Sequence, residues 1–241
     1  MRIIENTKIA LDTYKMVLQP TGSESEQLKA LVPGQFINIK IEGFYLRRPI
    51  SIADWNDESL TIIYKVVGKG TKVLSEMEQG IKLDILWPLG NGYNLTWIPD
   101  TAILIGGGVG VPPMYGLAKK LVEEGKKPRI ILGFREKNQV FYDNEFRKLG
   151  LEVTVYTEDG SYGEKGFVTD GFNQAEYVCA CGPERMLEAI YHKAQDGQYS
   201  FEARMACGFG GCMGCSCETL VGNKRICKEG PVLVHKELLW K

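Results

Sequence analysis

The second half of the chain takes its architecture from one stretch, Thr101-Ala102-Ile103-Leu104-Ile105-Gly106-Gly107-Gly108. Such an apolar run is typical of a strand buried on both faces of a parallel sheet, and here it leads directly into glycines. Residues 114–124 then show helical periodicity, Gly125 suits the end of that helix, and residues 129–134 form the next apolar run. Strand, helix and strand in this order make a βαβ unit, so the sequence predicts an α/β domain.

Further elements of the same kind follow along the chain. Strands are predicted at residues 151–156 and 177–180, and a helix is predicted over residues 184–194. Strands that alternate with helices indicate a doubly wound parallel sheet. We expect this domain to span residues 98–200, with its boundary near Trp97-Ile98-Pro99-Asp100.

The first 97 residues show a different pattern of short apolar runs separated by turn signals. Residues 36–41 alternate apolar and polar side chains as a half-buried strand does, and residues 60–67 form a second such run. A short helix is predicted over residues 71–77. The spacing favours a small antiparallel barrel with Greek-key connections as the first domain, residues 1–97.

Composition excludes several classes of function. The 241 residues are 44% hydrophobic and 24% charged, with a formal net charge of −1, so no electrostatic feature favours nucleic acid or an anionic membrane as partner. No apolar stretch reaches the roughly 18 residues of a membrane span. Glu5 and Lys8 interrupt the N-terminus before any run of signal-peptide length. We expect a cytoplasmic protein.

A cysteine-rich segment follows in residues 201–241, which we expect to form a small third domain. Five of the seven cysteines lie between Cys207 and Cys227, and Cys207, Cys212 and Cys215 have the C-x4-C-x2-C spacing that plant-type ferredoxins use for a [2Fe–2S] cluster. Glycines between them let backbone N–H groups point at the sulfur atoms. The spacing predicts a [2Fe–2S] cluster, with Cys227 as the fourth ligand.

Other readings of these cysteines have less support. Zinc ribbons usually present two C-x2-C knuckles, and only Cys212 and Cys215 form one here. A [4Fe–4S] cluster would more often show C-x2-C-x2-C. Disulfides are disfavoured in a reducing compartment. Cys217 is left out of the ligand set because the spacing is complete without it, and Cys179 is expected to be a small buried residue of a strand.

Two segments of the first domain suggest a phosphate site. Adjacent arginines occur in Arg47-Arg48-Pro49-Ile50-Ser51-Ile52, and Lys65-Val66-Val67-Gly68-Lys69-Gly70-Thr71 leads into the predicted short helix. Helix N-termini bind phosphate, so Arg48, Gly70 and Thr71 together could hold a pyrophosphate. Solvated charges at a strand end are the alternative for the arginines.

The glycine stretch of the second domain is a candidate dinucleotide site. It lacks a full G-x-G-x-x-G because Val111 takes the last position, but Pro112-Pro113 suits a first helical turn. Cys181-Gly182-Pro183 ends a later strand, where open α/β sheets bind ligands. A turn made only for packing is the alternative. The candidate residues are Gly106, Gly107, Gly108, Gly110, Cys181, Gly182 and Pro183.

Arg48-Pro49-Ile50-Ser51 resembles the flavin motif of the ferredoxin–NADP reductase superfamily, and Gly106 to Pro113 with Cys181-Gly182-Pro183 resembles its nicotinamide-domain motifs. With the cysteine loop added, the chain is similar from end to end to the electron-transfer subunits of class B dihydroorotate dehydrogenase. The resemblance implies FAD in the barrel, with Arg48 on the pyrophosphate, Ser51 near flavin N5 and Gly70-Thr71 on phosphate. Many relatives have a tyrosine at Ile50 that stacks on the flavin. The full set of implied FAD residues is Arg48, Pro49, Ile50, Ser51, Lys65, Val66, Val67, Gly70 and Thr71.

The resemblance also implies an oxidoreductase whose substrate chemistry takes place elsewhere. Electrons would pass between NAD(H), FAD, the [2Fe–2S] cluster and an FMN-containing catalytic subunit that oxidises dihydroorotate to orotate in pyrimidine (UMP) biosynthesis, in a heterotetramer of two plus two. NADH is favoured by the family alone, since Arg135 could contact a 2′-phosphate or face solvent. His192 and His235, the two histidines, are expected to be solvated, and no catalytic residue is expected.

Two alternatives remain open. The same modules occur in NAD(P)H reductases that feed ferredoxin or a hydrogenase. A flavin-free iron–sulfur sensor is the non-enzymatic alternative.

Overall fold

The computed structural model describes residues 1–22, 25–174 and 176–240. Its first sheet is antiparallel throughout, in the order β1-β2-β5-β4-β3-β6. The N-terminal end of β1 hydrogen-bonds to the segment before β6, from Ile3 N to Ile81 O at 2.9 Å and from Leu83 N to Met1 O at 2.8 Å, which closes the sheet into a barrel. The strands are β1 (Arg2–Ala10), β2 (Thr13–Gln19), β3 (Phe36–Ile39), β4 (Arg48–Trp55), β5 (Leu60–Lys65) and β6 (Ile85–Leu89), and the helices are α1 (Glu26–Lys29) and α2 (Lys69–Ser75).

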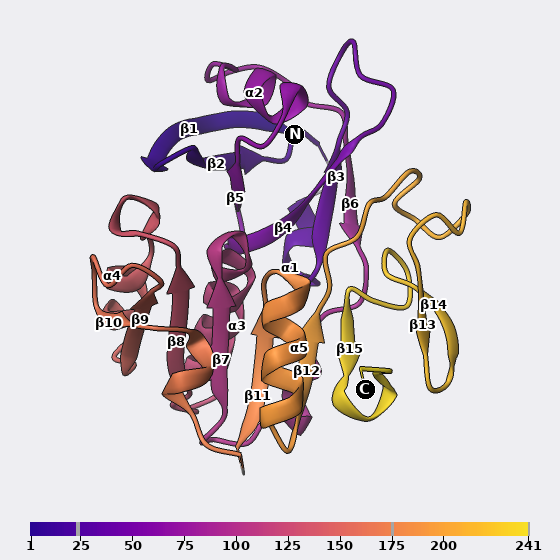
Figure 1. Ribbon diagram of the computed structural model, residues 1–241. Coiled ribbons are helices and arrows are strands. Elements are labelled where there is room, and N and C mark those ends of the chain that lie inside the picture. The colour runs from indigo at the N-terminus through magenta and orange to yellow at the C-terminus, as the bar shows by residue number, and fades with distance from the viewer. Residues whose placement is uncertain (23–24, 175, 241) are drawn as a thin grey trace.

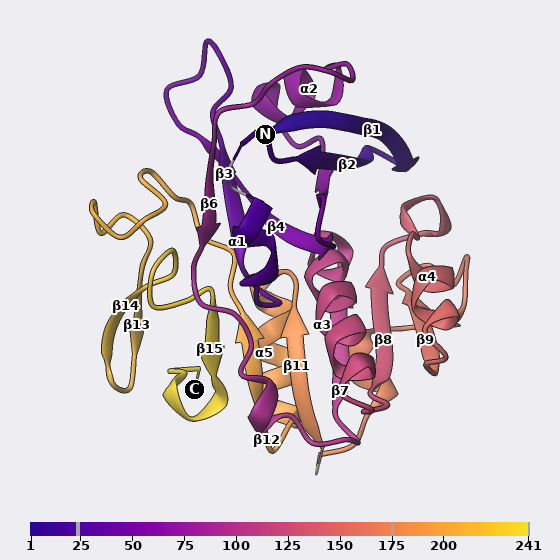
Figure 2. The same ribbon diagram turned by 180° about the vertical axis from the view of Figure 1, so that it is seen from behind.

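The second sheet has seven strands in the order β10-β9-β8-β7-β11-β12-β15, parallel from β10 to β12. Helices α3 and α5 lie on its opposite faces, as the two views show (Figures 1 and 2), so the sheet is doubly wound. Among the described residues, no helix has the length and apolar character needed to cross a membrane. The elements are β7 (Ile103–Gly107), α3 (Val111–Glu123), β8 (Arg129–Phe134), α4 (Asp143–Lys148), β9 (Val153–Thr157), β10 (Glu164–Lys165), β11 (Tyr177–Cys181), α5 (Glu184–Lys193), β12 (Asp196–Ser200) and β15 (Val232–Val234).

Helix α3 joins the barrel to the α/β sheet. Its buried face shares one apolar cluster with Ala53 of β4 and Ile63 of β5. Lys119 of α3 also forms an ion pair with Asp54, 2.7 Å from Nζ to Oδ1. This packing fixes the end of the barrel next to the turn that begins α3.

The C-terminal segment runs beside both sheets (Figure 1). It contains the hairpin of β13 (Ser216–Thr219) and β14 (Gly222–Arg225), and then returns as β15 to pair antiparallel with β12. Cys215, Ile226 and Cys227 share a buried cluster with Phe36 of the barrel. The predicted fold class, a barrel followed by a doubly wound domain and a cysteine loop, is confirmed. The exact division at residues 97/98 and 200/201 stays a prediction, and β15 shows that the last segment also completes the preceding sheet.

Candidate functional site

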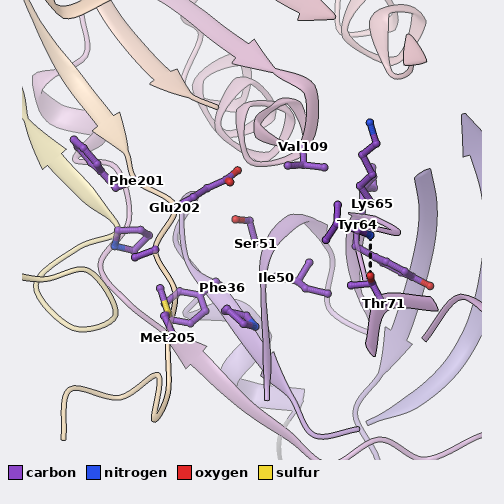
Figure 3. A pocket seen from close by; sticks show the side chains of 15 residues that line it. Phe36, Ile50, Ser51, Tyr64, Lys65, Thr71, Val109, Phe201, Glu202 and Met205 are labelled. Carbon is purple, nitrogen blue, oxygen red and sulfur yellow. Dashed lines mark hydrogen bonds between the residues drawn. The ribbon is translucent and has the colours of Figure 1, made fainter. Parts of the chain in front are cut away.

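A pocket of about 290 Å³ lies where the three parts of the chain meet. One wall comes from strands β3, β4 and β5, another from Val109 in the turn before α3, and a third from residues 201–205 after β12 (Figure 3). Six of the predicted FAD residues line it, namely Pro49, Ile50, Ser51, Lys65, Val67 and Thr71. The pocket is therefore bordered by all three predicted modules.

Arg48 lies next to Gly70, as a shared pyrophosphate site requires. A Cβ atom at Gly70 would lie 2.5 Å from Arg48 Nε, so a larger residue would displace the Arg48 side chain from this position. The guanidinium carbon lies 4.9 Å from the centre of the Phe44 ring, and Nη1 donates to the carbonyl oxygen of Leu46. Arg48 and Gly70, which are distant in sequence, are thus brought together at the start of α2.

The Thr71 hydroxyl is used within its own turn. Its Oγ1 accepts hydrogen bonds from the N–H groups of Val67 and Gly68, at 3.0 and 3.2 Å, and donates to the carbonyl oxygen of Gly68 at 3.1 Å. Val66 N donates to Asp12 O at 2.7 Å, which closes the barrel side of the same turn. In this structure Thr71 therefore stabilises the predicted phosphate turn. Its hydroxyl group donates its hydrogen bond to the carbonyl oxygen of Gly68.

Aromatic rings line the pocket even though Ile50 supplies none. They belong to Phe36, Tyr64 and Phe201. Tyr64 is part of the barrel core, and its hydroxyl donates to Asn6 Oδ1 at 2.9 Å. Phe201 is stacked from behind on Trp240, with ring centres 5.1 Å apart. Phe36, which is itself buried, and Phe201 pack in the cluster that contains Cys215 and Cys227.

The glycine turn after β7 meets the end of β11. These strands are neighbours, with Gly106 paired to Cys181, so their carboxyl ends open at the same edge of the sheet. A Cβ atom at Gly110 would lie 2.1 Å from the carbonyl oxygen of Cys181, so this close approach needs glycine. The predicted nicotinamide residues of the two segments are thus brought together beside the pocket. Arg135 lies exposed after β8.

Glu202 was not predicted, and it lines the pocket opposite the barrel (Figure 3). Its carboxyl is accessible from the pocket, and burial by the surrounding protein raises its pKa. Cys181 is buried, which raises the pKa of its thiol to about 12, and the charge of Glu202 adds to that effect. Cys179 is fully buried in β11 as expected. Ligands bind at the carboxyl ends of such strands, but β12 itself was not predicted, so the sequence offered no signal for Glu202.

The four predicted cluster ligands form two pairs. The Cys212 side chain helps to lower the pKa of Cys207, and the Cys215 side chain helps to raise the pKa of Cys227. Cys215 Sγ also accepts a hydrogen bond from Cys227 N at 3.4 Å. Gly211 N donates to Cys207 Sγ at 3.2 Å and Gly214 N to Cys212 Sγ at 3.4 Å. Such N–H groups stabilise negative sulfur.

The thiols differ in acidity for clear reasons. Burial opposes ionisation of Cys207, but N–H groups from Phe209 and Cys212 outweigh it and lower the pKa of Cys207 to about 6. Burial and the neighbouring Cys215 raise the pKa of Cys227 to about 12. The exposed end of the loop therefore favours the thiolate form that iron requires.

Cys217 has different surroundings from these pairs. Its thiol contacts the carbonyl oxygen of Glu218 at 3.6 Å, and burial, Glu184 and Glu218 together raise its pKa. Across the part of the chain that the structure describes, no three Cys, His, Asp or Glu side chains converge closely enough to hold one metal ion. Two pairs of thiols fit the four thiolates of a two-iron cluster better than they fit a single tetrahedral zinc.

One expectation about the histidines was wrong. His192 is exposed on α5 as expected, but His235 is half-buried. Its ring stacks on Tyr191 with centres 4.3 Å apart, and Nδ1 lies 3.1 Å from the hydroxyl of Tyr199. β15 carries His235 onto the aromatic side chains of α5 and β12, a placement that its position in the tail did not reveal.

Two family models match this chain. Residues 202–239 match the iron–sulfur cluster binding domain of dihydroorotate dehydrogenase B, and residues 104–192 match an oxidoreductase NAD-binding domain. Curated relatives match almost the full length. The chain is 44% identical to the dihydroorotate dehydrogenase B (NAD(+)) electron transfer subunit of Fusobacterium nucleatum, covering 97% of this chain and 95% of that protein. It is 40% identical to the subunit of the same name from Shouchella clausii, covering 99% and 97%.

Solved structures share the arrangement. The structure of an NADH-dependent reduced ferredoxin-NADP oxidoreductase, described for flavin-based electron bifurcation, superimposes with a TM-score of 0.86 at 30% identity, over 99% of this chain and 89% of that chain. The Amycolatopsis cytochrome P450 reductase GcoB superimposes with a TM-score of 0.65 at 22% identity, over 78% of this chain and 62% of that one. The second likeness concerns the fold alone.

Proposed function

The chain belongs to the family of dihydroorotate dehydrogenase B (NAD(+)) electron transfer subunits, and we propose that its three sites carry electrons between NAD(H) and a catalytic subunit. It is an oxidoreductase subunit that uses FAD, a [2Fe–2S] cluster and NAD(H). In this family the subunit serves the oxidation of dihydroorotate to orotate in pyrimidine biosynthesis.

One observation carries the proposal. A single pocket is lined by Ser51 of the barrel, by Val109 of the glycine turn, and by the segment from Phe201 to Met205 that leads into Cys207. A ligand in this pocket therefore contacts the nicotinamide side and the cluster side of the protein. When bound, FAD would exchange two electrons with a nicotinamide and single electrons with a cluster, which is the chemistry this order of sites needs.

In this proposal, separate groups of residues bind FAD, NAD(H) and the cluster. Arg48 and the start of α2 hold the FAD pyrophosphate, and Ser51 lies beside the reactive edge of the flavin. Ile50, Phe36 and Phe201 enclose the ring and exclude water from it. NAD(H) is held by Gly106 to Gly110 and by Cys181, Gly182 and Pro183. Cys207, Cys212, Cys215 and Cys227 hold the cluster.

The finer points of assembly belong to the same proposal. We place an FMN-containing, dihydroorotate-oxidising subunit as the partner, in a heterotetramer of two plus two. The family name, which describes an electron transfer subunit, supports a catalytic partner. A cytoplasmic location is supported by the thiolate ligands, because a reducing compartment keeps them free.

Reconstitution tests this function directly. The purified chain, with its flavin and cluster retained, is mixed with the dihydroorotate-oxidising subunit of the same genome, and orotate formation is followed with NAD⁺ as oxidant. We expect NAD⁺-dependent orotate formation only when both chains are present. NAD⁺-dependent orotate formation by the dihydroorotate-oxidising subunit without this chain would contradict the proposal. So would a mixture of the two chains that leaves NAD⁺ unreduced.

A ferredoxin-linked role is the second candidate. The 30% identical structure of a reduced ferredoxin-NADP oxidoreductase, which covers 99% of this chain, supports it. The identities of 40% and 44% to dihydroorotate dehydrogenase subunits favour the first candidate. NADH-dependent reduction of a ferredoxin, at a rate above that of orotate-linked transfer, would reverse this order.

A further inference from the structure

Asn38 is a buried polar residue between the barrel and the cysteine loop. It lies in β3, paired with Pro49 of β4 and Leu86 of β6, and its exposed fraction is 0%. Its neighbours Ile37 and Ile39 belong to the barrel core. Side chains alternate across a strand, so Asn38 points to the other face of β3, as does Phe36, which packs against the cluster segment.

The Asn38 amide contacts the first cluster ligand. Its Nδ2 donates to the carbonyl oxygen of Cys207 at 3.4 Å, across 169 positions of sequence. The next residue, Gly208, has a φ of +79°, and a Cβ atom there would lie 2.3 Å from Asn38 Nδ2. The backbone of Cys207 and Gly208 is therefore pressed against one side chain of β3, the strand whose Phe36 lines the pocket.

The other end of the same amide has no partner. Among the residues that the structure describes, Asn38 Oδ1 is the one buried side-chain nitrogen or oxygen atom without a hydrogen bond. An unpaired buried acceptor destabilises a protein, and an apolar side chain of the same shape would avoid that cost. Asn38 is thus a poor choice for stability alone.

We propose that Asn38 is a positioning residue for the cluster, whose amide holds the Cys207–Gly208 backbone against β3 and so sets the redox potential of the cluster. The inference rests on the proposed cluster site. Hydrogen bonds and dipoles around the cysteine ligands tune the potential of iron–sulfur clusters. The NH₂ group of the Asn38 amide faces the loop. Because its hydrogen atoms carry partial positive charge, it stabilises the reduced cluster, which is more negative than the oxidised one.

Two nearly isosteric replacements test this role in the full chain carrying flavin and cluster. Asn38→Leu removes both polar atoms, and Asn38→Asp keeps the shape but replaces the donor with a carboxylate oxygen. Iron content, the electron paramagnetic resonance spectrum and redox titration of cluster and flavin are measured. For Asn38→Leu we expect the equilibrium constant for electron transfer from flavin to cluster to fall about tenfold. This corresponds to a cluster potential that is lower by about 59 mV. Asn38→Asp should move it further in the same direction.

The matched control is Ile37→Val on the opposite face of β3. It should lower the midpoint of unfolding while leaving both potentials and the cluster spectrum unchanged. Loss of the cluster in both Asn38 variants, with their unfolding midpoints kept, also supports the role. Wild-type potentials and spectra in both Asn38 variants overturn it. A wild-type chain that binds no [2Fe–2S] cluster would instead refute the proposed function itself.

A double-mutant cycle tests the contact with Gly208 separately. Gly208→Ala introduces a methyl group that meets Asn38 Nδ2, and it also strains a backbone with positive φ. Asn38→Ala makes space for that methyl group, but the backbone strain is the same in both backgrounds and cancels in the cycle. We expect Gly208→Ala to shift the cluster spectrum less when Asn38 is alanine. Equal shifts in both backgrounds would show that the two residues do not act together.

Discussion

Gly110 and the carbonyl oxygen of Cys181 are so close that a Cβ atom on Gly110 would lie 2.1 Å from that oxygen. Gly110→Ala must therefore separate the two segments proposed to hold NAD(H). We expect the KM for NADH to rise roughly tenfold, the equivalent of about 1.4 kcal/mol, with flavin content unchanged. Steady-state reduction of a dye acceptor measures it. Gly22→Ala is the matched control, because no atom of the described residues lies within 4 Å of its Cβ position. A normal KM in Gly110→Ala would remove this turn from the nicotinamide site.

Serine replacements of the cysteines test the cluster assignment. Replacing Cys207, Cys212, Cys215 or Cys227 should abolish or strongly change the visible and paramagnetic signals of the cluster, because each removes one thiolate of the two pairs. Cys217→Ser should leave these signals as they are, since its thiol contacts Glu218 instead. Cluster loss in Cys217→Ser together with an intact cluster in Cys215→Ser would exchange the two assignments.

Arg48→Ala tests the pyrophosphate site. A hydrogen bond to a charged group contributes about 1.5–3 kcal/mol, so we expect the Kd for FAD to rise between about tenfold and about 150-fold. Titration of the flavin-free chain with FAD, followed by flavin fluorescence, gives the value. Arg47→Ala is the matched control, because Arg47 pairs with Asp84 at 2.9 Å. Equal effects of the two substitutions would indicate that positive charge alone, rather than a direct contact of Arg48 with the pyrophosphate, holds FAD.

His235 predicts a dependence of stability on pH. Burial lowers the pKa of its imidazole below the ordinary value of 6.5, so below that pH the unfolded chain binds a proton more readily than the folded chain does. Its contribution to stability is therefore present above pH 6.5 and is lost as the pH falls toward the folded-state pKa. Urea unfolding at several pH values should show wild type losing stability faster than His235→Phe across this interval. Parallel curves for the two proteins would mean that His235 does not titrate there.

Much of the fold is readable from the sequence because its elements depend on local patterns. The apolar run before Gly106 does form β7, and β8 covers the predicted residues 129–134. Helix α3 starts at Val111, three residues before the predicted start at Met114, because Pro112 and Pro113 fit its first turn. Gly70 and the Cys207 loop are equally recognisable, since close approaches and metal ligands restrict the residue type.

The features that the sequence did not reveal depend on neighbours far away in the chain. Glu202 is an ordinary acidic residue until β12 carries it to the edge of the pocket. Asn38 is one polar position in an alternating strand, where exposure to solvent was the natural expectation, yet the cysteine loop covers it. β15 has only three residues, too few for a periodic pattern, and its pairing with β12 takes His235 out of solvent. Local pattern gives no information about such contacts.

The pairing of β15 with β12 has a consequence for the cell that makes this protein. Residues 196–200 leave the ribosome before residues 232–234, so the edge of the parallel sheet stays uncovered while the cysteine segment between them is still being completed. Uncovered strand edges recruit strands from other chains. Because the cysteine segment connects β12 to the strand that covers it, we expect iron starvation during expression to increase the fraction of this chain found in aggregates.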